Sequence, residues 1–162
     1  MAKKLTREQV EQIIKSAHEK GERPDLEGAD LREAQLGGAD LTKANLTRAD
    51  LSRASLGGAN LSAVDFSGTV LRDTHLGGAN LSEANLTKAD LSQANLRGAN
   101  LRRANLSDAN LTGAHLFGAD LREADLREAN LNQADLKKAN LIGAKIKEEQ
   151  YQALIKAIGI VS

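Results

Sequence analysis

The sequence predicts a β-solenoid with square coils, in which four five-residue repeats complete one coil. Three observations support this: a five-residue period of large apolar residues, a twenty-residue period of glycine pairs, and a small residue two places before each large one. From position 26 to position 146 every fifth residue is Leu, except for Phe66 and Ile146. The pattern gives twenty-five repeats without an insertion or deletion.

A period of five belongs to neither regular secondary structure. Apolar residues recur about every 3.6 residues on one face of a helix and every second residue on one face of a strand. In a helix, residues five apart are rotated by about 140° around the axis, so no single face collects the large residues. We therefore expect each repeat to form one short side of a coil, and the coils to stack.

Glycine gives the number of sides in a coil. Glycine pairs recur twenty residues apart, and single glycines continue the same positions. Four repeats fill this interval, so the glycines should lie above one another on one side of the rod. They are Gly37, Gly38, Gly57, Gly58, Gly77, Gly78, Gly98 and Gly118.

The residue types assign an inside and an outside to each repeat. Ala stands two places before the large residue in twenty-one of twenty-five repeats, and Asp or Asn stands one place before it in nineteen. We expect Leu and Ala to point inward, and Asp and Asn to face water or bond to turn backbone. At a strand separation of about 4.8 Å, about six coils make a rod roughly 30 Å long. Burial of each large side chain contributes ~1.5–3 kcal/mol.

The repeat resembles that of a known family. Residues 58–62 (Gly-Ala-Asn-Leu-Ser) and 87–91 (Thr-Lys-Ala-Asp-Leu) show its pattern: Ala, then Asp or Asn, then Leu, then often Ser, Thr or Arg. This pattern is similar to the pentapeptide-repeat family over about three quarters of the chain. The resemblance implies a right-handed quadrilateral β-helix, and the handedness comes from the resemblance alone.

The composition disfavours several classes of partner. The 162 residues carry a formal net charge of zero, no Cys and 2% aromatic residues. Such a chain offers little to nucleic acid or to a membrane surface. Without Cys, no disulfide or thiolate metal site forms. The first residues lack the apolar core of a signal peptide, and no segment suits a bilayer, so we expect a cytoplasmic protein.

Residues 1–23 are expected to form an N-terminal capping segment, with a helix over 6–20. Thr6 and Gln9 have the spacing of a capping box, and Gly21 is the predicted stop. We expect the helix to cover the apolar end of the rod, and recognition of a partner is the alternative. Its apolar stripe consists of Val10, Ile13, Ile14 and Ala17.

The repeat region, residues 24–146, is regular except at residues 64–76. Two interpretations are open for this stretch. Either the larger residues pack in a slightly wider coil, or a local bulge presents Val70, which stands where Asp or Asn normally faces water. The departures from Ala are Val64, Thr69 and Thr74, and Phe66 replaces a central Leu.

Residues 147–162 are expected to form a C-terminal capping helix and a tail. The helix is predicted over 147–158, followed by Gly159, Ile160 and Val161. We expect it to fold over Ile146 in a monomer. The resemblance implies the alternative, a dimer through this helix, because family members that inhibit DNA gyrase dimerise through their C-terminal region. The predicted stripe is Tyr151, Leu154, Ile155 and Ile158.

No catalytic, cofactor-binding or metal-binding constellation is apparent, and we expect neither an enzyme nor a cofactor. His75 and His115 fall in one column, but two coils apart they are separated by about 10 Å, too far for one metal ion. Catalytic groups usually converge from irregular loops, and the repeats contain no insertion.

The candidate interaction surface follows the glycine side of the rod. Phe117 occupies an outward position in the glycine column, and arginines enrich the second half of the chain. Because acidic residues are interleaved with the arginines, we expect a face with ion pairs in preference to a phosphate-binding stripe. The candidate residues are Gly77, Gly78, Arg97, Phe117 and Val70. The arginines are Arg97, Arg102, Arg103, Arg122 and Arg127.

The leading functional hypothesis is a non-enzymatic scaffold that presents flat solenoid walls to an unknown protein partner. The resemblance implies an alternative, a DNA-mimicking inhibitor or protector of DNA gyrase. The near-zero net charge and the absence of loop insertions disfavour it. A consensus-built or cyanobacterial-type protein without an assigned activity is a third hypothesis, which the sequence does not separate from the first.

Overall fold

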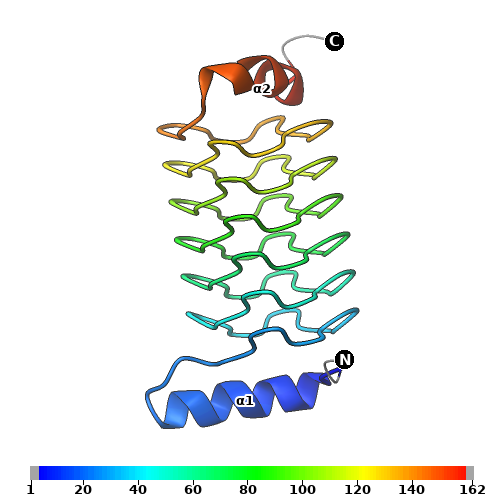
Figure 1. The fold of residues 1–162 in the computed structure, drawn as a ribbon, viewed down its shortest axis with the longest axis vertical. Helices are drawn as coiled ribbons and strands as arrows, with labels where there is room; N and C mark the ends of the chain where they lie inside the picture. The colour runs from blue at the N-terminus through cyan, green and yellow to red at the C-terminus, as the bar shows by residue number, and fades with distance from the viewer. Residues whose placement is uncertain (1–3, 160–162) are drawn as a thin grey trace.

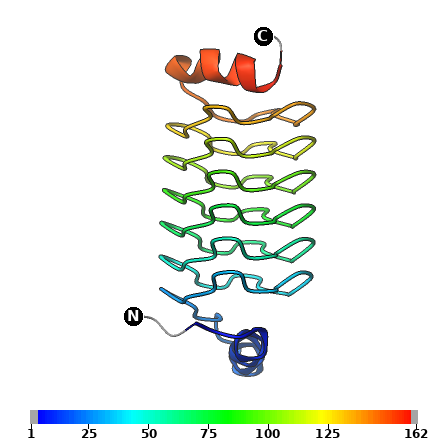
Figure 2. The same ribbon diagram turned by 90° about the vertical axis from the view of Figure 1, so that its right-hand side faces the viewer.

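The computed structural model describes residues 4–159 as a stack of similar coils with a helix at each end (Figures 1 and 2). Residues 1–3 and 160–162, including Ile160 and Val161 of the predicted tail, lie outside the described residues. Helix α1 spans Arg7–Glu19, the 3-10 helix η1 spans Glu148–Gln150, and α2 spans Tyr151–Ala157. No helix within residues 4–159 has both the length and the apolar character that a bilayer crossing requires.

Residues twenty positions apart lie above one another in neighbouring coils. Parallel bridges join Asp25 to Asn45 and Asn45 to Asp65, and the same column continues to Lys145. Each step is held from both sides: the Leu46 N–H donates to the Asp65 carbonyl at 2.8 Å, and the Asp65 N–H donates to the Ala44 carbonyl at 3.0 Å. The twenty-residue step therefore divides each coil into four repeats.

We call the four resulting columns of repeats walls 1 to 4. Wall 1 starts with the repeat centred on Leu26, wall 2 with Leu31, wall 3 with Leu36 and wall 4 with Leu41. Each wall continues in steps of twenty residues.

Each wall contributes isolated bridge residues, and residues 4–159 contain no continuous strand. The extended stretch is short because every repeat turns after its centre. In the turn after Leu31, the Ala34 N–H donates to the Leu31 carbonyl at 3.1 Å, and Glu33 has a φ of 62°. A positive φ at the third turn position is what a type II turn requires. β-branched residues, which strongly disfavour it, do not occupy this position in the repeats.

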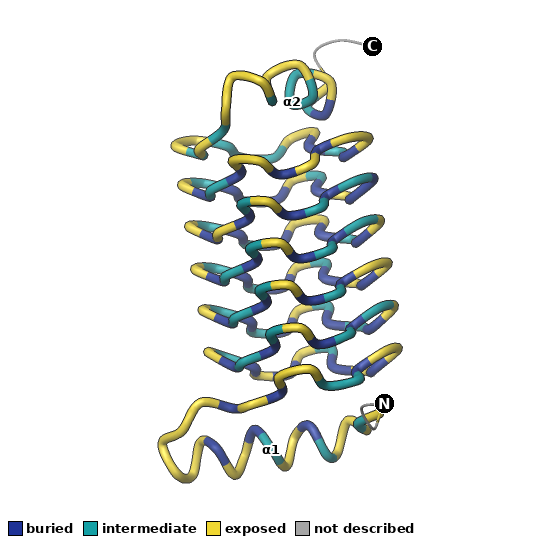
Figure 3. Tube along the Cα trace, viewed as in Figure 1, coloured by how far each residue is buried: buried dark blue, intermediate teal, exposed yellow. Residues whose placement is uncertain are grey.

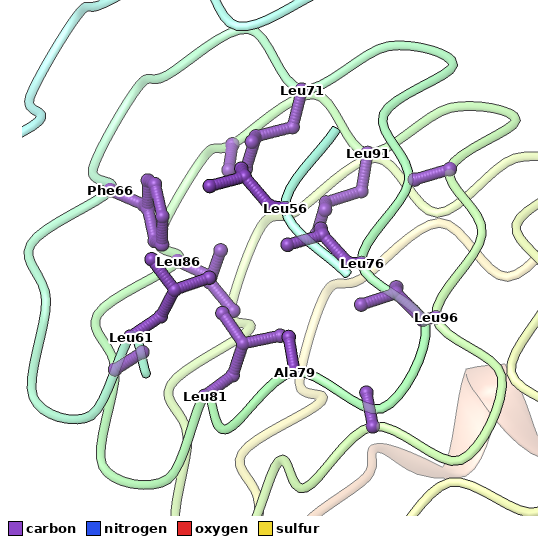
Figure 4. Close-up of a cluster of buried hydrophobic side chains, with 14 of the residues drawn as sticks. Leu56, Leu61, Phe66, Leu71, Leu76, Ala79, Leu81, Leu86, Leu91 and Leu96 are labelled. Atoms are coloured by element: carbon purple, nitrogen blue, oxygen red, sulfur yellow. The ribbon is translucent and has the colours of Figure 1, made fainter. Parts of the chain in front are cut away.

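The core is a column of central residues flanked by alanines. Figure 4 shows Leu56, Leu61, Phe66 and Leu71 pointing toward the axis from the four walls of one coil, and all four are fully buried. Figure 3 shows buried and more exposed residues alternating along each wall. The inside and outside of the repeat thus follow residue type, as the sequence predicts.

The irregular stretch, residues 64–76, keeps the ladder of backbone hydrogen bonds that joins neighbouring coils. Two of its larger residues are accommodated by hydrogen bonds, since the hydroxyls of Thr69 and Thr74 donate to the carbonyls of Leu46 and Leu51 at 2.6 and 2.9 Å. The Val70 N–H donates to the Ala49 carbonyl at 3.0 Å, and the Val70 carbonyl accepts from the Leu51 N–H at 2.8 Å. The ladder passes through Val70 without a bulge, so compensated packing describes this coil.

Helix α1 begins with a capping box. The Thr6 N–H donates to Gln9 Oε1 at 2.9 Å, and the Gln9 N–H donates to Thr6 Oγ1 at 3.3 Å. Val10 and Ile14 are buried against the first coil. At the other end Gly21 has a φ of 67°, and the Glu22 N–H donates to the Ala17 carbonyl at 2.8 Å, which closes the last turn.

The C-terminal segment differs from the predicted single helix. It starts with the 3-10 turn of η1, and α2 begins only at Tyr151. Ala157 is buried, Leu154 and Ile158 are partly buried against the core, and Tyr151 is 48% exposed. The prediction that Tyr151 belongs to the packing stripe is therefore wrong.

The residue before each centre stabilises the turn that follows. Asp40 Oδ1 accepts hydrogen bonds from the Thr42 hydroxyl at 2.5 Å and the Thr42 N–H at 3.1 Å. Asn45 makes the same pair of bonds with Thr47. The bonds from Thr42 lower the pKa of the Asp40 carboxyl from its ordinary value of 3.8. Because the folded pKa is the lower one, the charged carboxylate adds stability above its unfolded pKa, and this is lost as the pH falls through the folded pKa.

We predict that Asp40→Asn flattens the acid dependence of stability. The amide oxygen introduced by this substitution can accept both hydrogen bonds, as that of Asn45 does, but the amide has no proton to gain in acid. Denaturant unfolding at pH values from about 6 to about 2 measures the effect, and the variant should lose less stability in acid than the parent. Glu83→Gln is the control, since the Glu83 carboxylate accepts no hydrogen bond among residues 4–159. Parallel profiles for Asp40→Asn and the parent would contradict the prediction.

Candidate interaction surface

The lower part of wall 3 has bare backbone on its outer side. Gly57 and Gly77 lie in successive coils, joined by the bond from the Gly58 N–H to the Gly77 carbonyl at 3.0 Å. A Cβ built at Gly58 or Gly78 meets no atom within 4 Å. These glycines therefore border open space, and the turns of wall 3 carry no side chain there, while Ser55 and the exposed His75 lie beside them.

Phe117 lies between two cations farther along the same wall. The Arg97 guanidinium carbon is 5.3 Å from the centre of the Phe117 ring, and Lys138 Nζ is 5.2 Å from it. Both distances are within the range of cation–π attraction. Neither cation forms an ion pair within the described part of the chain. The ring is half-buried, and both cations are exposed.

Four of the five candidate residues share wall 3, whereas Val70 does not. The Gly78 N–H donates to the Arg97 carbonyl and the Gly98 N–H to the Phe117 carbonyl, both at 3.0 Å, so Gly77, Arg97 and Phe117 occupy successive coils. Val70 lies on wall 2, in the column of Asp50 and Asp90, and is half-buried.

Lys138 is a neighbour of Phe117 that the sequence pattern does not predict. The signal was present in the twenty-residue step, which places Lys137 above Phe117 and Lys138 above Gly118. The direction of the lysine side chain, however, is set by rotamer choice, which the repeat pattern does not encode.

Three of the five arginines of the second half pair with carboxylates. Arg122 and Arg127 each contact the Asp of their own repeat at 2.5 Å, and Arg103 reaches Glu123 of the next coil at 2.9 Å. Hydrogen bonds from Arg122 and Arg127 lower the pKa of the carboxyls of Asp120 and Asp125. Exposed pairs of this kind contribute little to stability. Arg97 faces Phe117, and Arg102 has no carboxylate partner within residues 4–159.

The polar side chains do not form a metal centre in the described part of the chain. Within residues 4–159, no three His, Cys, Asp or Glu side chains are grouped so that they could hold an ion. His75 and His115 share a column, with Asn95 bridged to both and lying between them.

The repeat matches a known sequence family. The family model described as pentapeptide repeats matches in eight copies, over residues 25–62, 65–103, 79–116 and 114–148. None of the curated proteins matches the chain.

Solved structures resemble the chain, and pentapeptide-repeat proteins are among them. QnrB1, a plasmid-mediated fluoroquinolone resistance protein, is 21% identical with a TM-score of 0.59, and the match covers 88% of this chain and 75% of QnrB1. HetL, a protein involved in heterocyst differentiation regulation from the cyanobacterium Nostoc sp. strain PCC 7120, is 41% identical with a TM-score of 0.46. That match covers 76% of this chain and 60% of HetL, so the chain spans three fifths of HetL. A protein of the Arabidopsis thaliana thylakoid lumen is 29% identical with a TM-score of 0.45, covering 78% of this chain and 77% of that one.

We predict that Arg97 and Phe117 are energetically coupled. A double-mutant cycle with Arg97→Ala and Phe117→Leu should give a coupling free energy of about 0.5–1 kcal/mol, the usual size of an exposed cation–π pair. Urea unfolding of the four proteins measures it. The control cycle combines Phe117→Leu with Arg53→Ala, a cation on wall 2, and should show no coupling. Equal values in the two cycles would contradict the prediction.

Proposed function

The chain belongs to the pentapeptide-repeat family, and on that basis we propose that it is a non-enzymatic scaffold that binds a protein partner through wall 3. Its coils form the right-handed quadrilateral β-helix of this family. A rod of this kind offers long, flat and rigid faces, which suits it to recognition of other proteins.

The observation that supports wall 3 is the position of Phe117 next to bare backbone. Aromatic and arginine side chains are enriched where protein interfaces contribute most to binding. Phe117 and Arg97 supply both types, and the glycine positions around Gly57 and Gly77 let a partner approach the backbone closely. We include Gly78 in this surface. Val70 would be a separate apolar contact on wall 2.

The uniform repeats support a role without catalysis. The interior is filled by Leu and Ala, and the outward segments are short turns of one type. Catalytic groups converge when loops of different length bring them together, and the repeats offer no such loops. We accordingly propose no cofactor.

The DNA-mimicking alternative, which would act on DNA gyrase, has weaker support. The likeness to QnrB1 at 21% identity concerns the fold. A mimic of DNA needs a strongly negative surface to compete for a positively charged groove, whereas this chain has a formal net charge of zero.

We further propose a division into three parts: a capping segment over 1–23, about six coils over 24–146, and a capping segment with tail over 147–162. The N-terminal assignment is supported by the Leu5 N–H, which donates to the Asp30 carbonyl at 3.0 Å, and by Arg7 Nη1, which donates to the Gln35 carbonyl at 3.1 Å. Both bonds satisfy carbonyls at the edge of the first coil. With a helix packed against the core at each end, a monomer is expected, and the cytoplasm is the predicted location.

We predict that Gly77→Arg combined with Phe117→Asp removes partner binding. Gly77 tolerates a side chain, because a Cβ there lies 3.8 Å from its nearest neighbour, the Arg97 carbonyl oxygen. The long side chain and the new charge then obstruct wall 3 while the fold stays intact. Pull-down from lysate identifies the partner, and calorimetry with the purified partner should show binding at least about tenfold weaker for the variant.

The control variant is Ser67→Arg combined with Ser107→Asp, which makes the same side chains at equivalent positions of wall 1, also two coils apart. It should bind like the parent. Equal loss in both variants, or full binding by the wall 3 variant, would contradict the use of wall 3. Capture of gyrase subunits with inhibition of supercoiling would favour the alternative function.

We predict that deletion of residues 1–22 causes aggregation while the remaining coils keep their β signal in circular dichroism. The deletion exposes unpaired carbonyls of Asp30 and Gln35 and the apolar end of the core, which Val10 and Ile14 cover. Light scattering and size-exclusion chromatography measure the effect. A soluble, monomeric product would indicate that α1 serves a partner and not the rod.

A further inference from the structure

The ladder of wall 2 ends with two unused donors. In the coil below, the Leu111 N–H donates to the Asn130 carbonyl and the Gly113 N–H donates to the Asn132 carbonyl, both at 2.9 Å. The equivalent donors of the last wall 2 repeat are the N–H groups of Leu131 and Gln133. Neither has an acceptor among residues 4–159.

The missing acceptors can be identified from the register of the ladder. Leu111 and Gly113 reach carbonyls nineteen residues ahead, so Leu131 and Gln133 would reach those of Gln150 and Gln152. At this point, however, the chain enters η1 and α2 and leaves the wall.

The Gln150 side chain replaces one backbone donor of the ladder. In the coil below, the Asn130 N–H donates to the Ala109 carbonyl at 2.9 Å. At the end of the rod, Gln150 Nε2 donates to the equivalent carbonyl, that of Ala129, at 2.9 Å, and to the Leu126 carbonyl at 2.7 Å. The carbonyl side of the edge is thereby satisfied, whereas the donor side of wall 2 is left open.

A cleft of about 600 Å³ adjoins these donors. Leu131, Asn132 and Gln133 line it from wall 2, and Ala153, Lys156 and Ala157 line it from α2. The two alanines are four residues apart on one helix face, and their small size leaves space beside the edge. Lys156 forms no ion pair within the described residues and places a positive charge at the cleft.

The opposite end of wall 2 shows how an extended segment covers such an edge. Lys4 bridges Asp30 in parallel, and the Leu5 N–H donates to the Asp30 carbonyl at 3.0 Å. Leu5 is also partly buried against the core. A short extended segment with a central Leu therefore completes this wall at its first coil, without forming a coil of its own.

We propose that the C-terminal edge of wall 2 binds an extended segment of a partner protein by strand addition. The carbonyls of the first and third residues of the segment accept from Leu131 and Gln133, as those of Asn130 and Asn132 do one coil below. An aliphatic central residue points toward Ala153 and Ala157, and an acidic flanking residue faces Lys156. This site is separate from wall 3 and stands independently of the function proposed there.

The probe is an N-acetylated, C-amidated peptide with the sequence of residues 128–133, Glu-Ala-Asn-Leu-Asn-Gln, which covers the wall 2 edge one coil below. Amide exchange and chemical shifts of the full chain are followed by NMR during titration. In the free protein, the amides of Leu131 and Gln133 should exchange much faster than those of Leu111 and Gly113. At a peptide concentration about ten times Kd, their exchange should slow about tenfold. Protection before peptide is added, or no change on titration, would overturn the proposal.

Two protein variants localise the site. Ala153→Trp fills the cleft and should abolish the response, whereas Gln152→Trp places the same side chain at an exposed position of α2 and should preserve it. If both variants respond like the parent, the cleft is not the site.

Comparison amides and ligands test the mode of binding. Leu141 and Gly143 of wall 4 also lack acceptors within residues 4–159 but do not line the cleft, and their amides should not respond. A peptide with Asp in place of its Leu should bind at least tenfold more weakly, by about 1.4 kcal/mol. An equal response at wall 4, or the same shifts with sodium acetate, would overturn strand addition in favour of non-specific edge binding or an anion pocket.

Discussion

The backbone of each coil is the hydrogen-bonding template for the next one, and this constraint governs the rest of the molecule. A donor such as the Leu46 N–H finds its acceptor at Asp65, and the Asp65 N–H returns the bond to Ala44. The pairing works only when every coil has the same length and turns at the same places. Larger residues such as Thr69 and Phe66 are therefore accommodated inside the coil, by a hydroxyl bond or by filling the axis, and the path of the backbone is kept.

The same constraint organises the outer surface into columns. Besides the residues of its own repeat, an outward side chain has neighbours twenty residues away in the coils above and below, so surface chemistry extends along the rod. Arg103 meets Glu123 in this way, and Arg97 meets Phe117. Where the column holds glycine, as at Gly57 and Gly77, the turns of the wall carry no side chain, although Ser55 and His75 of the same repeats do. In the proposed recognition by wall 3, the glycine turns let a partner approach the backbone, and Phe117 with its two neighbouring cations supplies side-chain contacts.

Much of the fold follows from the sequence because the repeat encodes its own register. The period of five, the glycine step of twenty and the capping box at Thr6 each correspond to a local physical requirement, and each predicts a feature that the structure contains. For the candidate site, the sequence predicts only which residues share a column. It puts Phe117 and Arg97 in successive coils of wall 3, but the contact of Lys138 with the Phe117 ring depends on the lysine rotamer. Tyr151 is exposed because the packed face of α2 consists of Ala153, Leu154, Ala157 and Ile158. Helical spacing predicts which residues share a face, but not which face packs against the rod. The N–H groups of Leu131 and Gln133 lack acceptors within residues 4–159 because the chain leaves the ladder where η1 begins, and the repeat period does not predict this point.

Because four five-residue repeats make one coil, the number of repeats that precede a residue decides on which wall it lies. Insertion of four repeats between coils would lengthen the rod and leave every column aligned. Insertion of a single repeat would keep Leu and Ala in the core, because nearly all repeats have the same interior, but would move everything after it to the next wall. If the repeat were inserted between Gly77 and Arg97, Arg97 and Phe117 would lie on wall 4, a quarter turn away from Gly57 and Gly77. Duplication or loss of one pentapeptide can thus combine existing surfaces into a new face in a single genetic step, while the core that supports them remains unchanged.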